Sequence, residues 1–155
     1  VTLGKQTDTG DDSGSVVKEM LVPEFTEETL QKVLQSFLGK QKQLPPMYSA
    51  IKINGQKLYQ LARKGVEVER ELRDIEVYKL ELLNFTANTL TLAVDCSKGT
   101  YIRALARDIG EALNSGAHLI GLIRTRVGEV KLEDCMQVEG FAEWLEKQEI
   151  ETINE

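Results

Sequence analysis

The fold of this chain is most tightly constrained by one stretch in which the hydrophobic period changes from that of a strand to that of a helix. Polar and apolar residues alternate over residues 89–96, which is typical of a strand with one buried face. The apolar residues that follow have the spacing of an amphipathic helix, at Ile102, Leu105, Ala106, Ile109 and Leu113. Between the two, residues 97–100 predict a turn at Gly99, with Thr100 or Ser97 as the cap of the helix.

Two cations, Lys98 and Arg103, lie at this strand-to-helix junction. The free backbone N–H groups of a helix start, together with two cations, suit an anion, either a carboxylate or a phosphate. The alternative is that both are ordinary surface charges, although cations at a helix N-terminus oppose the helix dipole by a few tenths of a kcal/mol. The spacing alone leaves both interpretations open.

The remaining periodicities predict an α+β protein. Residues 75–83 alternate and should pair with residues 89–96 as an antiparallel hairpin. Thr26 is the expected N-cap of a helix that ends at Gly39, with an apolar face of Leu30, Val33, Leu34, Phe37 and Leu38. A second hairpin is expected between residues 1–3 and 15–17, a strand-like run over 117–128, and an acidic helix over 139–150.

Composition excludes several classes of protein. The 155 residues, of which 41% are hydrophobic, suffice for one domain with a core, and no repeat or linker indicates a second complete domain. No apolar run approaches the roughly 18 residues that span a bilayer, and no secretory signal is visible. Two widely spaced cysteines and one histidine predict no metal site and fit a cytoplasmic protein. That histidine, His118, suits either a general base or a structural hydrogen bond to the backbone, and we favour the structural role.

The net charge of −6 argues against nucleic acid, but its distribution answers part of that objection. Residues 40–73 carry eight Lys and Arg against three Glu, a net charge of +5. Residues 133–155 carry eight acidic residues against one lysine, a net charge of −7. Because an electrostatic field depends on where the charges lie, the middle of the chain can attract an anion that the tail repels.

The basic middle segment also carries aromatic rings. Pro45-Pro46 favours an extended backbone, Tyr48 and Tyr59 supply flat rings, and the charges come from Lys52, Lys57, Arg63 and Lys64. Residues 51–55 predict a strand that enters a turn, followed by a short helix with an apolar face at Leu58, Leu61 and Ala62. Cations mixed with aromatic rings suit RNA loops, whose unstacked bases accept stacking. The alternative is an exposed basic hairpin with snorkelling lysines.

The junction Cys96-Ser97-Lys98-Gly99-Thr100-Tyr101-Ile102-Arg103 resembles the motif that carries the active-site arginine of the TruB-type tRNA pseudouridine synthases. Further stretches resemble the same family in the same order over roughly residues 3–138: residues 3–11, 43–52, 55–59, 62–68 and 116–119. The resemblance implies an α+β fold, with a mixed, mostly antiparallel sheet flanked by helices. It also implies an inserted basic hairpin at residues 40–73 that grips the tRNA T-loop.

The resemblance further implies a reaction and its participants. The family detaches a T-loop uracil from its sugar, turns it and rejoins it through carbon, with the base flipped into a pocket and with no metal or redox cofactor. Arg103 matches the arginine that pairs with the catalytic aspartate, and Leu122 matches the apolar residue against which the flipped base rests. Lys98 is expected to support the turn or the backbone around the pocket. The residues expected to contact the T-arm of tRNA are Tyr48, Lys52, Lys57, Arg63, Lys64 and Lys98.

One part of the family pattern is missing from this sequence. The catalytic aspartate of the family lies in a Gly-x-Leu-Asp-Pro motif, and this sequence contains no Asp-Pro pair. We therefore expect residues 1–155 to be part of a catalytic domain that lacks its N-terminal portion. Such a chain should be inactive alone and should form a homodimer, or be complemented, through the open edge of its sheet. Two alternatives are a non-catalytic tRNA-binding or chaperoning module and an interaction domain whose working surface is the acidic tail.

Overall fold

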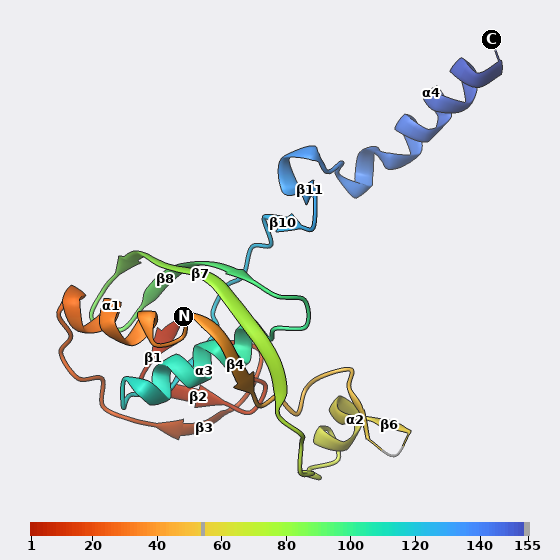
Figure 1. Cartoon of the computed structure of the whole chain (residues 1–155). Helices are drawn as coiled ribbons and strands as arrows, with labels where there is room; N and C mark the ends of the chain where they lie inside the picture. Colours follow the sequence, from red (N-terminus) through yellow and green to blue (C-terminus); the bar gives the residue numbers. More distant parts are fainter. Residues whose placement is uncertain (54, 154–155) are drawn as a thin grey trace. The chain divides into compact units, whose positions relative to one another are not determined.

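The computed structural model describes residues 1–53 and 55–153, and only the backbone of residues 148–153. The chain forms two compact units, Val1–Gly121 and Leu122–Glu155, which are described separately (Figure 1). In the described part of the chain, no helix is both long enough and apolar enough to cross a membrane.

The centre of the first unit is a three-stranded antiparallel sheet. Its order is β4 (Gly39–Gln43), β7 (Arg73–Phe85) and β8 (Leu90–Cys96). The hairpin predicted for residues 75–83 and 89–96 is confirmed, with Leu80 opposite Val94. Alternation puts Ile75 and Val77 on the core side, and the register shift between Val77 and Lys79 lets Leu80 face the core as well.

Two helices bury their apolar faces in the same core as the sheet. They are α1 (Glu27–Gln35) and α3 (Ile102–Ala112), and Leu30, Leu34, Leu105 and Ile109 belong to one hydrophobic cluster with β7. Both predicted helices are confirmed, as is the cap of α1, where the Thr26 hydroxyl accepts from the Thr29 N–H at 3.2 Å.

Two details of the helix ends differ from expectation. The helix α1 ends at Gln35 rather than at Gly39, because Ser36 turns its hydroxyl back onto the Val33 carbonyl while Gly39, at φ +85°, opens β4. Neither Thr100 nor Ser97 caps α3, whose N-cap is Tyr101. Ser97 is engaged elsewhere, since its hydroxyl accepts from the Glu76 N–H at 2.9 Å.

The first strand of the N-terminal hairpin lies a few residues further along the chain than predicted. Its strands are β2 (Lys5–Thr7) and β3 (Val16–Glu19), whereas β1 (Thr2–Leu3) pairs with β9 (Ala117–His118). Gly4 separates the two pairings because its φ of +89° breaks the strand. The predicted strand-like run over 117–128 is confirmed only at Ala117–His118 and Arg126–Val127, and the chain leaves the first unit after Gly121, between these two strands.

The basic segment between β4 and β7, residues 44–72, is called the insertion below. It contains a short hairpin of β5 (Lys52–Ile53) and β6 (Gln56–Lys57), followed by α2 (Leu58–Ala62). The predicted strand, turn and short helix are confirmed here, except that Asn54 in the turn lies outside the described residues.

The second unit has no core of its own among the side chains described. It contains β10 (Arg126–Val127), β11 (Val130–Lys131), the 3-10 turns η1 (Leu132–Asp134) and η2 (Val138–Gly140), and α4 (Phe141–Ile153). Every residue from 122 to 147 is exposed. The acidic helix expected over 139–150 is confirmed as α4, and residues 154–155 of the predicted acidic segment lie outside the description.

Candidate active site

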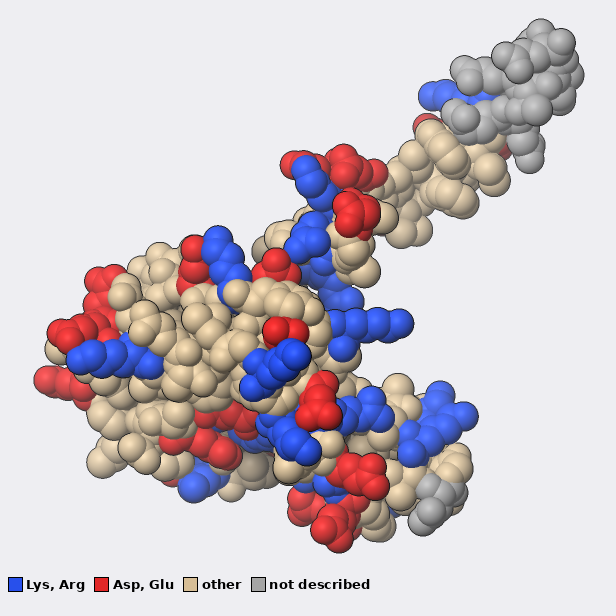
Figure 2. Space-filling model, viewed as in Figure 1, with Lys and Arg blue, Asp and Glu red and all other residues tan. Residues whose placement is uncertain are grey.

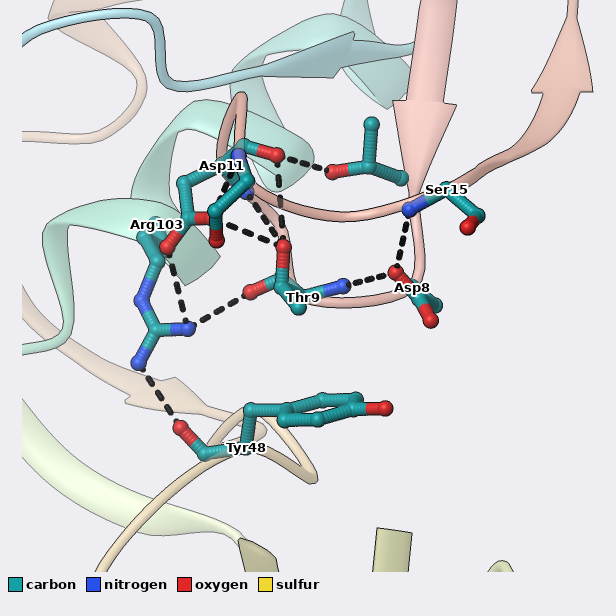
Figure 3. A network of polar contacts seen from close by, with 8 residues as sticks. Asp8, Thr9, Asp11, Ser15, Tyr48 and Arg103 are labelled. Atoms are coloured by element: carbon teal, nitrogen blue, oxygen red, sulfur yellow. Dashed lines mark hydrogen bonds and ion pairs between the residues drawn. The ribbon is translucent and has the colours of Figure 1, made fainter. Parts of the chain in front are cut away.

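Arg103, on the first turn of α3, joins two segments that are far from it in sequence. Its Nη1 donates to the Thr9 carbonyl at 2.7 Å, and its Nη2 donates to the Tyr48 carbonyl at 2.7 Å (Figure 3). The same Nη1 lies 3.4 Å from Oδ2 of Asp11. The guanidinium is therefore held in one orientation by two neutral acceptors and one carboxylate.

The carboxylate partner, Asp11, is stabilised in its ionised form by its own loop. Its Oδ1 accepts from the Thr9 hydroxyl at 2.7 Å, the Ser13 hydroxyl at 2.5 Å and the Ser13 N–H at 3.2 Å. Burial favours the neutral acid, but the hydrogen bonds from Ser13 and Thr9 and the charge of Arg103 outweigh it and lower the pKa of Asp11. The anion expected at the strand-to-helix junction before α3 is therefore, in the free chain, the Asp11 carboxylate.

Asp8 fixes the same loop from its other side. Its Oδ1 accepts from the Thr9 N–H at 2.8 Å and from the Ser15 N–H at 2.9 Å (Figure 3). These bonds hold the loop between β2 and β3 in the shape that presents the Thr9 carbonyl and Asp11 to Arg103. The hydroxyls and carboxylates of Asp8, Thr9, Asp11 and Ser13 thus support one guanidinium.

A hollow of about 460 Å³ lies beside Arg103 within the first unit. Its wall includes polar groups of Asp8 and Arg103 and apolar groups of Met47, Val66 and Ala104. Since these residues come from the β2–β3 loop, the insertion and α3, the hollow is bounded by all three. A cavity with an apolar floor and a few fixed polar groups suits a flat ligand with polar edges, such as a nucleobase.

Only some of the residues predicted to contact RNA lie close to one another. Lys57 and Arg63 place their cations 5.6 Å and 5.3 Å from the centre of the Tyr59 ring on α2. Lys52 is exposed on the same hairpin and Lys64 just after the end of α2, and Figure 2 shows Lys and Arg side chains over β6 and α2. Tyr48 lies apart from this group and contributes its carbonyl to Arg103.

The other predicted site residues stand separately. Lys98 is exposed at the turn before α3 and makes no hydrogen bond or ion pair within residues 1–53 and 55–153. Leu122 is the first residue of the second unit and is 56% exposed. His118 is buried, with Nδ1 3.0 Å from the Lys5 carbonyl, which is the backbone hydrogen bond expected of its structural role.

The contacts of Thr9 and Asp11 with Arg103 were not predicted. Both residues lie in a stretch that resembles the family, and that resemblance was the only signal available for them. No local spacing points to the contact, because Thr9 and Arg103 are 94 residues apart.

Comparison with known protein families gives two adjoining matches. The family model described as TruB family pseudouridylate synthase, N-terminal domain, matches residues 1–102. The model described as tRNA pseudouridylate synthase B C-terminal domain matches residues 103–154. Arg103 is thus the first residue of the second match.

Several curated proteins named tRNA pseudouridine synthase B are similar to this chain. The protein from Phocaeicola vulgatus is 56% identical over 129 residues, which cover 83% of this chain and 55% of the relative. One from Bacteroides fragilis is 48% identical over 151 residues, covering 97% and 65%. One from Francisella tularensis is 47% identical over 154 residues, covering 99% and 51%. The chain therefore spans between about half and two thirds of the length of these relatives.

A solved structure has a similar fold. A chain in the crystal structure of a Cbf5–Nop10–Gar1 complex superimposes with a TM-score of 0.62 at 31% identity, covering 81% of this chain and 33% of that one. Together with the antiparallel sheet and its helices, this similarity confirms the predicted α+β class.

Proposed function

This chain belongs to the TruB family of pseudouridylate synthases, and from that membership we propose that it acts in isomerising a T-loop uridine of tRNA to pseudouridine. The observation that carries the proposal is the fixed guanidinium of Arg103. Two neutral carbonyls and the Asp11 carboxylate hold its orientation, and the hollow beside it has room for a base.

The chemistry proposed for Arg103 is electrostatic. By family resemblance, the arginine at this position pairs with the catalytic aspartate. A fixed cation beside that carboxylate keeps it ionised and oriented for attack on the sugar of the target nucleotide. The apolar part of the hollow would receive the flipped base and exclude water from a charged intermediate.

The insertion is the proposed grip on the T-arm of tRNA. It carries the four cations Lys52, Lys57, Arg63 and Lys64 without an acidic partner in the part of the insertion that is described. Two of them, Lys57 and Arg63, flank the Tyr59 ring. The residues proposed to contact RNA are Tyr48, Lys52, Lys57, Arg63 and Lys64, with Lys98 supporting the turn and Leu122 meeting the base. Phosphate contacts of this kind make RNA affinity fall as salt rises.

The chain alone is proposed to be inactive, because no aspartate in it can be assigned as the nucleophile by its motif. The test is pseudouridine formation in a T-arm stem-loop RNA. The assay would contain this chain alone, or this chain mixed with a domain that carries the Gly-x-Leu-Asp-Pro motif. Product only in the mixture supports the proposal, whereas no product in either with RNA still bound contradicts it.

Replacement of the central arginine sharpens this test. In the complemented enzyme, Arg103→Ala should remove most turnover and leave RNA affinity within about threefold, because the cations of the insertion remain. Arg73→Ala is the matched control, since Arg73 is exposed and its side chain makes no hydrogen bond or ion pair among the residues described. Unchanged turnover in Arg103→Ala would remove Arg103 from the mechanism.

A second candidate function is a non-catalytic tRNA-binding or chaperoning module. It is favoured by one observation, that the sequence retains the basic insertion without an assignable nucleophile. RNA binding that weakens steeply with salt but yields no product, even with the Asp-containing domain present, would establish this function instead.

We also propose that the outer edge of β8 pairs with a second copy of the chain. Val1 pairs with Leu90 through two backbone hydrogen bonds, and beyond Leu90 the outer edge of β8 meets no other described strand. Unpaired strand edges recruit further strands. Sedimentation should therefore detect a dimer, and a monomer at every concentration would refute this pairing.

A further inference from the structure

The insertion is rooted by a short buried segment, residues 43–49, called the strap below. Most of its residues are buried, although it forms no strand after Gln43, the last residue of β4. The buried ones are Gln43, Pro45, Pro46, Met47 and Ser49. Two of them are prolines, which have no N–H to donate and cannot join the ladder of β7. The carbonyls of the strap must therefore find donors outside the sheet.

Three arginines supply these donors. Arg107 Nη2 donates to the Leu44 carbonyl at 3.1 Å, and Arg70 Nη1 donates to the Pro45 carbonyl at 2.9 Å. The third is Arg103, through the Tyr48 carbonyl. The strap is thus held at both of its ends by side chains of α3, because Arg103 and Arg107 are four residues apart and lie on one face of that helix.

Gln43 extends the same attachment to the start of α3. Its side-chain amide donates to the Tyr101 carbonyl at 3.1 Å and accepts from the Tyr101 N–H at 2.9 Å. This reciprocal pair satisfies a backbone N–H at the helix start that no cap satisfies. The strap and the start of α3 are therefore linked by three side chains, those of Gln43, Arg103 and Arg107.

Arg107 is placed to fix the orientation of the insertion relative to the sheet. Its Nε is held by Asp108 at 2.8 Å, so the guanidinium is oriented before it reaches the strap. Arg70 comes from the far end of the insertion, close to β7, and closes the insertion onto its own beginning through Pro45. Together these contacts fix the direction in which the insertion leaves the sheet.

We propose that Arg107 is a positioning residue, which holds the insertion at the angle that brings RNA bound there to Arg103. The inference rests on the proposed function, because it assumes that the insertion grips RNA. It goes beyond that function by assigning a role to Arg107, which also lines the hollow beside Arg103 but acts here through its bond to the strap. Its first half, that Arg107 holds the insertion in place, is tested on the free chain. Its second half, that this position brings bound RNA to Arg103, is tested on the RNA complex.

The first half is tested by hydrogen exchange on the free chain. Arg107→Ala should speed exchange of the amides of residues 47–59 by about tenfold or more, and leave those of β7 and β8 unchanged. Arg73→Ala removes an exposed arginine near the same end of the insertion and should change neither region. The double variant Arg107→Ala, Asp108→Ala avoids leaving an unpaired, half-buried carboxylate and should match the single variant. Exchange equal to that of Arg73→Ala would overturn the proposal.

The second half is tested by crosslinking the chain to a T-arm RNA that carries 4-thiouridine at the target position. In the unsubstituted chain, crosslinks should map to the residues around Arg103, in the β2–β3 loop and α3. In Arg107→Ala, those crosslinks should fall at least about fivefold while RNA affinity stays within about threefold, since the cations of the insertion remain. A merely structural role would lower affinity and all crosslinks together.

The outcomes separate the two proposals. Faster exchange with an unchanged crosslink pattern would show that Arg107 holds the strap without positioning RNA, which overturns the inference. Absence of RNA binding by the unsubstituted chain would overturn the proposed function, whereas the exchange result would still decide whether Arg107 fixes the strap.

Discussion

The close approach of α3 to β9 makes Gly110 the position where one added methyl group should do the most damage. A Cβ built on Gly110 would overlap the Cβ of Ala117 and lie 2.5 Å from both the Ala117 nitrogen and the Gly116 carbonyl carbon. The Gly110 carbonyl also accepts from the N–H groups of Ser115 and Gly116, at 3.0 and 3.1 Å. Because the obstructing atoms include backbone, no side-chain rotation relieves the overlap.

Two opposing free energies decide the effect of Gly110→Ala. Alanine is favoured over glycine in a helix interior by about 1 kcal/mol. Overpacking of a rigid core costs about 1–3 kcal/mol and occasionally more, and an overlap with backbone belongs at the upper end. The net expectation is a loss of about 2 kcal/mol or more in the free energy of unfolding, which is roughly a thirtyfold change in the folding equilibrium.

Urea denaturation followed by circular dichroism measures this loss, with Gly121→Ala as the matched control. A Cβ on Gly121 meets nothing within 4 Å, and its φ lies outside the strained region, so the control should change stability by less than about 0.5 kcal/mol. If Gly110→Ala were as stable as the unsubstituted chain, the tight seam between α3 and β9 would be refuted. The seam matters for function because α3 carries Arg103.

Two further predictions concern the site. Because the folded-state pKa of Asp11 lies below its ordinary value, its ionised form stabilises the fold above about pH 4 and this contribution is lost as the pH falls through the folded pKa. Urea midpoints between pH 6 and pH 3 should therefore fall more steeply for the unsubstituted chain than for Asp11→Asn, and parallel curves would contradict the lowered pKa. Tyr59→Leu keeps an apolar side chain but removes the ring that Lys57 and Arg63 flank, so T-arm affinity should fall at least about fivefold at unchanged thermal stability. Fluorescence anisotropy with labelled RNA measures this, and an unchanged affinity would exclude base stacking on Tyr59.

Local signals explain which parts of the fold were predictable. The β7–β8 hairpin and α3 have long, clean periods, and both were predicted within a few residues of their ends. The bounds of the N-terminal hairpin were predicted wrongly because the break at Gly4 depends on the pairing of β1 with β9. These strands are more than 100 residues apart, so no local sequence pattern indicates their pairing. Ser97 failed as a cap because a strand N–H, that of Glu76, competes for its hydroxyl.

The site was predictable where a motif carried it and not where contacts span the chain. Arg103 was found from the residues around it, but its acceptors on Thr9 and Tyr48 come from loops remote in sequence. Tyr48 illustrates the limit well, since its residue type indicated a ring contact and its backbone carbonyl forms the bond to Arg103. A carbonyl is present at every residue, so no residue type can indicate which one a guanidinium will use.

The net charge of −6 and the proposed binding of RNA are compatible because the basic hairpin contains no acidic residue, and several acidic residues near it in the first unit are already engaged. Asp8 and Asp11 are occupied by hydroxyls, backbone N–H groups and Arg103, and Glu67 pairs with Arg70. Most of the remaining acidic excess lies in residues 133–155, in the second unit. Residues 51–66 carry four cations and no acidic residue. Since charge acts over about 8–10 Å in physiological salt, an approaching phosphate responds to this local excess rather than to the sum over the chain.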